Sequence, residues 1–164
     1  SILFSLIRIH LNKKVYELKD ADVNVRFIGS RDKLSKNLIK SIKLIEDSTR
    51  ECTGLQINVA VDYGGRDEIV KIIKEIATDI KSDCLDLSDI DENLLDQKSV
   101  LAHCGQPDLI LRTGGEKRLS NFLLWHSAYS ELSFVDTKWP DFTAENLIEQ
   151  VEAFKKRDRK YGDL

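Results

Sequence analysis

Hydrophobic residues recur every three or four positions in four stretches of the chain, and this spacing predicts amphipathic helices. The stretches are residues 3–18, 34–45, 67–80 and 144–156. The second helix is expected to close near Thr53-Gly54 with glycine as the stop, and Asp67 is expected to cap the third. A shorter helix is predicted around Leu94-Leu95, inside an acidic segment at residues 82–98.

Other stretches alternate apolar and polar residues singly or form short apolar runs, as strands do. They lie at residues 23–28, 55–61, 109–112 and 132–135. Ser120 is expected to cap a further helix over residues 121–130. Strands that alternate with helices predict an α/β fold with a mainly parallel central sheet flanked by helices. The length of 164 residues suits a single domain, residues 1–164.

Composition narrows the class of protein. Charged residues make up 32% of the chain and hydrophobic residues 41%, and the formal net charge is −3. A net charge so close to zero gives no argument for nucleic-acid binding. No apolar run reaches the roughly 18 residues that a membrane span needs. Three cysteines without a C-x-x-C pair indicate reduced thiols in a cytoplasmic protein.

The start of the chain is unusual. The sequence contains no methionine, and Ser1 lies inside the apolar periodic pattern of the first predicted helix. We therefore expect a fragment whose N-terminal part is missing.

A polar patch between two apolar runs is the strongest candidate site. Arg112 ends a predicted strand, Arg118 precedes Ser120, and Gly114-Gly115 lies between the two arginines. Ligands of parallel sheets gather where strands end, and glycine lets a ligand approach the backbone closely. Two guanidinium groups, a hydroxyl and a helix N-terminus would together bind an anion, most naturally a phosphate or diphosphate. Neither a Walker motif nor G-x-G-x-x-G occurs, which disfavours an ordinary nucleotide site.

Plainer interpretations of these residues stay open. Arg118 could lie in water or pair with Glu116, as loop arginines usually do. Glu131 follows the predicted helix at 121–130, so it could lie at the same sheet edge as the arginines. There it could bind a Mg²⁺ ion that in turn binds a diphosphate. Alternatively, its carboxylate is simply solvated. The histidines, among them His126, lack metal-ligand spacing, so packing is favoured over catalysis.

Three longer segments resemble a known family. Residues 107–132 (PDLILRTGGEKRLSNFLLWHSAYSEL) and 137–142 (TKWPDF) are similar to the C-terminal signature of the cis-prenyltransferases. Residues 57–69 (INVAVDYGGRDEI) resemble the central block of that family, and the likeness is greatest to the bacterial undecaprenyl diphosphate synthases. The resemblance implies an enzyme that condenses isopentenyl diphosphate with an allylic diphosphate, usually farnesyl. The product would be a long-chain polyprenyl diphosphate of cis geometry, such as the undecaprenyl carrier lipid precursor.

The resemblance also implies roles for single residues. Arg112, Arg118 and Ser120 would hold isopentenyl diphosphate, and Glu131 would help to bind Mg²⁺. An apolar tunnel, a homodimer and at most peripheral membrane contact during product release are further implications. The supporting positions are Asn58, Gly64, Gly65, Arg66, Asp141 and Gly162.

The chain departs from the family pattern in several places. The N-terminal block of the family, with its metal-binding aspartate and glycine-containing phosphate loop, has no counterpart before Val23. Glu131 would therefore lack its metal partner, and we expect little or no turnover from this fragment. Asp62, Lys117 and Lys160 also differ from the residues usual in the family. The alternatives are a non-catalytic subunit of the same family and an unrelated α/β module that binds phosphorylated ligands.

Overall fold

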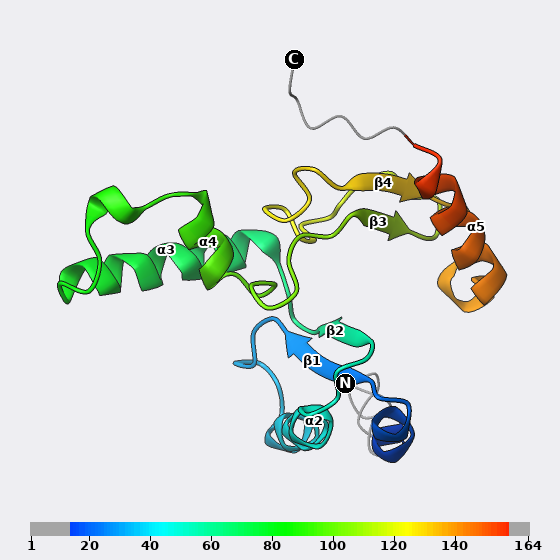
Figure 1. Ribbon diagram of the computed structural model, residues 1–164, viewed down its shortest axis with the longest axis horizontal. Helices are drawn as coiled ribbons and strands as arrows, with labels where there is room; N and C mark the ends of the chain where they lie inside the picture. The colour runs from blue at the N-terminus through cyan, green and yellow to red at the C-terminus, as the bar shows by residue number, and fades with distance from the viewer. Residues whose placement is uncertain (1–13, 158–164) are drawn as a thin grey trace. The chain divides into compact units, whose positions relative to one another are not determined.

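The computed structural model describes residues 14–157 of the chain (Figure 1). These residues belong to two compact units, an N-terminal unit (Ser1–Tyr63) and a C-terminal unit (Gly64–Leu164). Each unit has its own pair of parallel strands and its own helices. The sequence predicts one mainly parallel sheet, whereas the described residues form two separate two-stranded sheets. A single domain over the whole chain stays a prediction.

In the N-terminal unit, a helix connects two parallel strands. β1 (Asn24–Ile28), α2 (Lys36–Thr49) and β2 (Gln56–Ala60) follow one another along the chain. Residues 14–20 are helical as well, and the earlier part of that predicted helix lies outside the described residues. All three predicted elements from 23 to 61 are thus confirmed, and their order is the one that parallel strands require.

One face of α2 forms the centre of the N-terminal unit. Leu38, Ile42 and Ile45 are 2%, 1% and 0% exposed. Their spacing of three and four residues places them on a single side of the helix, as its sequence predicts. There they join Val25 and Phe27 of β1 in one hydrophobic core.

Thr49 binds the end of α2 to β1. Its side chain is fully buried, and its hydroxyl donates to the Ile45 carbonyl at 2.9 Å while accepting from the Val25 N–H at 3.1 Å. Nδ2 of Asn24 donates to the Thr49 carbonyl oxygen at 2.8 Å. Buried polar groups must find such partners, so these bonds fix how the helix end meets the strand.

The predicted glycine stop of this helix is wrong. α2 ends at Thr49, and its C-cap Arg50 is in the right-handed helical conformation. Gly54 lies beyond the helix, where an added Cβ would come within 2.5 Å of the Asp22 carbonyl oxygen. This glycine therefore allows two segments to approach closely and does not terminate the helix.

The C-terminal unit contains a long helix, a short helix, a strand pair and a final helix. Their bounds are α3 (Gly65–Lys81), α4 (Glu92–Lys98), β3 (Leu109–Arg112), β4 (Glu131–Phe134) and α5 (Ala144–Lys155). Two 3-10 helices, η1 (Leu87–Asp89) and η2 (Trp139–Asp141), lie between them. These bounds confirm the strand at 109–112 and the helix at 144–156. No helix within residues 14–157 is long and apolar enough to span a membrane.

Two helix starts differ from the sequence predictions. The N-cap of α3 is Gly64, and Asp67 lies in the first turn of the helix, where its charge favours the positive end of the dipole. Residues 121–129 form turns and bends and not the predicted helix. Ser120, Asn121 and Leu123 have φ angles of 49°, 65° and 45°, which are left-handed and incompatible with a right-handed helix.

Replacing Thr49 by valine should destabilise the protein by about 1–3 kcal/mol, because the buried Val25 N–H loses its acceptor while the side-chain shape is kept. Thr78→Val is the matched control, because the exposed Thr78 hydroxyl makes only the equivalent intrahelical bond, to the Lys74 carbonyl at 2.8 Å. The control should change stability by less than about 0.5 kcal/mol. Urea unfolding followed by circular dichroism measures both, and equal effects would contradict the assignment.

Candidate functional site

The candidate site begins where β3 ends, at Arg112. The next residues turn sharply, since Gly114 and Gly115 have φ angles of 88° and 77°, a region that glycine enters without steric cost. Their N–H groups donate to the carbonyls of Thr137 and Val135, both at 2.9 Å. The glycine pair thus turns the chain back against the segment that follows β4, as the sequence predicts for a loop at this position.

The Arg112 side chain contacts the far end of this loop. Its Nη1 donates to the Ser120 hydroxyl at 2.9 Å and to the main-chain carbonyl of Arg118. The structure therefore brings together Arg112 and Ser120, two of the three residues that the sequence assigns to one anion site. These bonds hold the guanidinium group in one place beside the loop backbone.

The Arg118 side chain makes a different contact. Its Nη1 binds the carboxylate of Glu116, and the side chains of Arg118 and Glu116 are 60% and 50% exposed. This is the plainer pairing that the sequence left open. Exposed ion pairs contribute about 0–1 kcal/mol, so an anionic ligand with stronger charge could take the place of Glu116 at little cost.

A cavity of about 220 Å³ adjoins the two arginines. It is lined by Ile110, Leu111, Arg112, Arg118, Leu119 and Phe122. Four of these side chains are apolar and two are cationic, so the cavity could receive a ligand with an anionic head and a hydrocarbon tail. Drug-sized ligands occupy roughly 300–1,000 Å³, so this volume suits a small ligand and not a long prenyl chain.

Glu131 does not share an edge with Arg112. In the parallel register, Glu131 pairs with Leu109 at the start of the strands, and Arg112 pairs with Phe134 at their end. A rise of about 3.3 Å per residue separates the two positions by roughly 10 Å along the pair. The expectation that both lie on one working edge is wrong, because Glu131 is the first residue of its parallel strand and Arg112 is the last residue of the neighbouring one.

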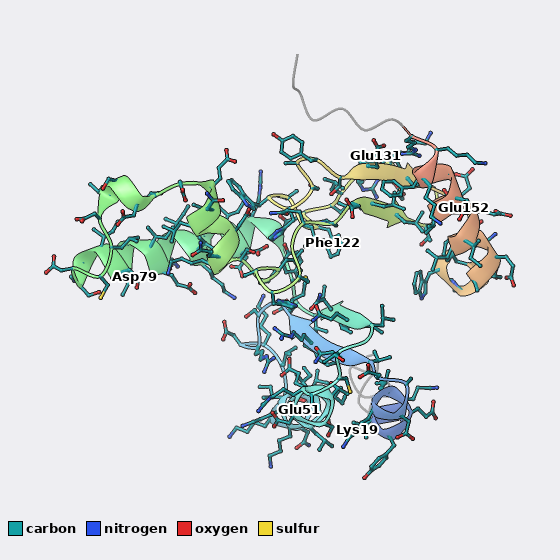
Figure 2. The ribbon with its side chains drawn as sticks, viewed as in Figure 1. Lys19, Glu51, Asp79, Phe122, Glu131 and Glu152 are labelled. Carbon is teal, nitrogen blue, oxygen red and sulfur yellow. The ribbon has the colours of Figure 1, made fainter. Side chains whose placement is uncertain are left out.

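The Glu131 carboxylate is bound by a cation of the chain itself. Figure 2 shows Glu131 on β4, and its Oε2 accepts from Nη1 of Arg157 at 2.8 Å. Within residues 14–157 no three histidine, cysteine or acidic side chains are close enough to hold a metal ion together. Mg²⁺ is usually bound by one or two carboxylates together with substrate phosphates, and the Glu131 carboxylate, the predicted ligand, is paired with Arg157.

The supporting positions are divided between the units. Asn58 lies on β2 opposite Arg26 in the N-terminal unit. Gly64, Gly65 and Arg66 begin α3 in the C-terminal unit, where they contact residues 121–124. Asp141 ends η2 as an exposed residue, and no ion pair with an arginine is found for it within the described part of the chain. Gly162 and Lys160 lie outside the described residues.

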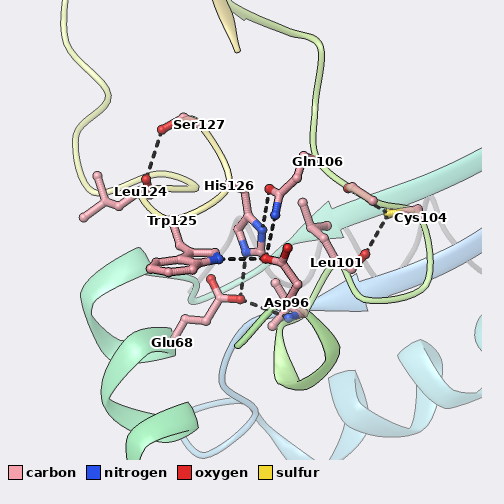
Figure 3. Close-up of polar contacts among 11 residues, drawn as sticks. Glu68, Asp96, Leu101, Cys104, Gln106, Leu124, Trp125, His126 and Ser127 are labelled. Carbon is pink, nitrogen blue, oxygen red and sulfur yellow. Dashed lines mark hydrogen bonds and ion pairs between the residues drawn. The ribbon is translucent and has the colours of Figure 1, made fainter. Parts of the chain in front are cut away.

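A polar cluster surrounds the buried pair His126 and Glu68 (Figure 3). His126 is 2% exposed, in keeping with the packing role that the sequence favours, which stays a prediction. Its Nε2 lies 3.0 Å from Glu68 Oε1 and its Nδ1 lies 3.1 Å from Gln106 Oε1. Asp96 Oδ1 accepts from Gln106 Nε2 at 2.8 Å and from Trp125 Nε1 at 2.7 Å.

Sequence reasoning missed Glu68 and Asn121. Glu68 shares the buried face of α3 with Ile72 and Ile76, and a glutamate four residues before an apolar position on that stripe was a usable signal. Asn121 gave no comparable signal, because its partners Gly65 and Arg66 are distant in the sequence.

Comparisons with known proteins identify the family of this chain. A family model described as "Putative undecaprenyl diphosphate synthase" matches residues 1–162. The isoprenyl transferase of Aquifex pyrophilus is 43% identical over 160 residues, which are 98% of this chain and 67% of that protein. A tritrans,polycis-undecaprenyl-diphosphate synthase (geranylgeranyl-diphosphate specific) of Methanopyrus kandleri is 45% identical over 140 residues, 85% of this chain and 52% of that protein. The chain belongs to the undecaprenyl diphosphate synthase family of isoprenyl transferases.

Solved structures agree with this family. The lavandulyl diphosphate synthase of Lavandula x intermedia, solved with dimethylallyl diphosphate, matches with a TM-score of 0.94 and 31% identity over 98% of this chain and 70% of its own. A probable undecaprenyl diphosphate synthase of Campylobacter jejuni matches with a TM-score of 0.84 and 32% identity over 99% of this chain and 74% of its own. The predicted α/β fold with parallel strands is thereby confirmed. The chain spans about two thirds of the length of the curated relatives it matches.

Replacing Glu68 by alanine should destabilise the protein by about 2–3 kcal/mol, because the His126 ring and the Val100 N–H, which donates at 2.9 Å, both lose a buried charged acceptor. Glu75→Ala, at an exposed position of the same helix, is the matched control. Chemical denaturation should show a change within about 0.5 kcal/mol for the control. A Glu68→Ala protein as stable as the control would refute the proposed role of the cluster.

Proposed function

We propose that this protein binds isopentenyl diphosphate at the Arg112 loop and serves cis-prenyl chain elongation. The observation that carries the proposal is the Arg112–Ser120 pair beside a cavity lined by two arginines and four apolar side chains. An allylic diphosphate such as farnesyl diphosphate is the proposed second substrate, and a long-chain polyprenyl diphosphate of the undecaprenyl type the proposed product.

The charge of the loop supports a diphosphate head. Planar guanidinium groups hold phosphate oxygens through paired hydrogen bonds, and the Ser120 hydroxyl adds a donor beside them. Arg112 is held by Ser120 and by the Arg118 carbonyl, whereas Arg118 makes an exposed pair with Glu116. We infer that Arg112 supplies a preset contact and that Arg118 leaves Glu116 to bind the ligand.

The apolar wall supports a short prenyl tail. Each buried methylene contributes about 0.8 kcal/mol, so the five carbons of an isopentenyl group would gain several kcal/mol against Ile110, Leu111 and Phe122. In this role the residues of the loop position the alkene for attack on the allylic carbon. The charged head fixes one end of the substrate and the cavity fixes the other.

Several parts of the prediction rest on the family resemblance alone. They are the long apolar tunnel, the homodimer, the role of Gly162, the cytoplasmic location and the use of Mg²⁺, to which Glu131 would contribute one carboxylate. Because the Glu131 carboxylate is paired with Arg157, we expect this chain by itself to bind substrate with little or no turnover. A non-catalytic member of the family is the second candidate, and the intact Arg112 loop counts against it.

Replacing Arg112 by alanine should weaken the binding of isopentenyl diphosphate by about 10- to 100-fold, because hydrogen bonds to charged groups contribute about 1.5–3 kcal/mol. Arg112→Lys should recover only part of this loss, since it restores the charge and not the planar fork. Arg118→Ala should also weaken binding. Isothermal titration calorimetry measures all three.

Arg50→Ala serves as the control, because Arg50 is an exposed arginine of the N-terminal unit that pairs with Asp47. It should bind as the unchanged protein does. Absence of binding by the unchanged protein would contradict the proposed function. Equal affinity for the Arg112→Ala and Arg50→Ala proteins would place the diphosphate elsewhere.

A further inference from the structure

The first turn of α3 requires hydrogen-bond acceptors from another segment. The first N–H groups of a helix have no partner inside it, and the N-cap of α3 is Gly64, which has no side chain to offer one. Asn121 supplies both acceptors. Its carbonyl oxygen accepts from the Gly65 N–H at 2.7 Å, and its Oδ1 accepts from the Arg66 N–H at 2.9 Å.

The glycine pair at the start of α3 is shaped for this contact. A Cβ added at Gly64 would lie 2.7 Å from Nδ2 of Asn121, and one added at Gly65 would lie 2.9 Å from Cγ of Leu124. The Asn121 side chain could shift away from a Cβ at Gly64, but a Cβ at Gly65 would also lie 3.0 Å from the Leu124 backbone nitrogen, so glycine at position 65 allows the segment to approach the helix. Asn121 has a φ of 65°, a left-handed conformation that asparagine tolerates better than most residues.

Asn121 is also joined directly to the residues that hold Arg112. Ser120 precedes it in the chain, and the Ser120 hydroxyl accepts from Arg112 Nη1 at 2.9 Å. The other end of the segment is held as well, because His126 lies 3.0 Å from Glu68 in the same first turn of α3. Residues 121–126 are therefore bound to α3 at both ends, and the position of Ser120 follows from that attachment.

We propose that Asn121 is a positioning residue for the diphosphate site. By capping α3 it holds the backbone at Ser120, and through Ser120 it holds the Arg112 guanidinium where the ligand head binds. The inference rests on the proposed function, since it assigns a residue to the same site. Asn121 acts through Ser120 and Arg112 and needs no contact with the ligand.

Three variants of the full chain test this role. Asn121→Gly keeps the left-handed backbone and the main-chain acceptor but removes Oδ1, so it is the mild variant. Asn121→Ala removes Oδ1 and also disfavours the positive φ. Asn146→Ala is the matched control, because Asn146 Oδ1 accepts from the Thr143 N–H at 3.1 Å in the cap of α5, a contact with no link to Arg112.

Calorimetry with isopentenyl diphosphate, below the Tm of every variant, gives the main readout. Asn121→Gly should raise the Kd about five- to thirtyfold, and Asn121→Ala should raise it further. Asn146→Ala should lower the Tm without changing the Kd.

In a Ser120→Ala background, Asn121→Gly should raise the Kd less than it does in the unchanged protein, because the effects of residues that act through one another are not additive. Amide hydrogen exchange at Arg66 should be faster in Asn121→Gly than in the unchanged protein.

The outcomes separate this inference from the proposed function. If the unchanged protein does not bind isopentenyl diphosphate, both are wrong. If it binds and Asn121→Gly binds equally well, only the positioning role is wrong. Additive effects of Asn121→Gly and Ser120→Ala would also overturn it, because Asn121 would then act independently of Ser120. Unchanged exchange at Arg66 would show that the cap is not formed in solution.

Discussion

The attachment of residues 121–126 to the first turn of α3 is the contact on which the candidate site depends. Asn121 caps the helix, Leu124 packs against Gly65, and His126 meets Glu68 in the same first turn. The helix start has no capping side chain of its own, and the loop supplies one. The contact between His126 and Glu68 is buried, and buried polar contacts of this kind help to make an arrangement specific.

Two arginines with similar sequence surroundings acquire different roles from this arrangement. Arg112 binds the loop backbone and Ser120, so its guanidinium group is held before any ligand arrives. Arg118 pairs with Glu116 at the surface and can exchange partners cheaply. Because Arg112 is already held in place, less conformational entropy is lost when a ligand binds it. Arg118, which can leave Glu116, adds a second positive charge. Together with the four apolar side chains of the adjoining cavity, they suit the small prenyl diphosphate that we propose as the ligand.

The parallel register of β3 and β4 keeps Arg112 and Glu131 apart. Arg112 ends β3 while Glu131 begins β4, so the two lie at opposite ends of one strand pair. Arg157 neutralises the Glu131 carboxylate. The residues proposed to bind diphosphate are therefore assembled at one end of the strand pair, and the proposed metal ligand Glu131 lies at the other.

The sequence by itself determined the local elements and the family. Periodicity located β1, α2, β3 and α5, because burial of one helix face or a short strand leaves a regular apolar pattern. The segment from 107 to 132 indicated the diphosphate loop through its residue types.

Only the tertiary structure decided that residues 121–129 are not helical and that Gly54 allows a close approach and stops no helix. Glu68 and His126 meet across 58 positions of sequence, and Asn121 caps a helix that begins 56 residues before it. The local sequence pattern does not indicate contacts between residues that are so far apart in the chain. These contacts determine which backbone conformation is stable.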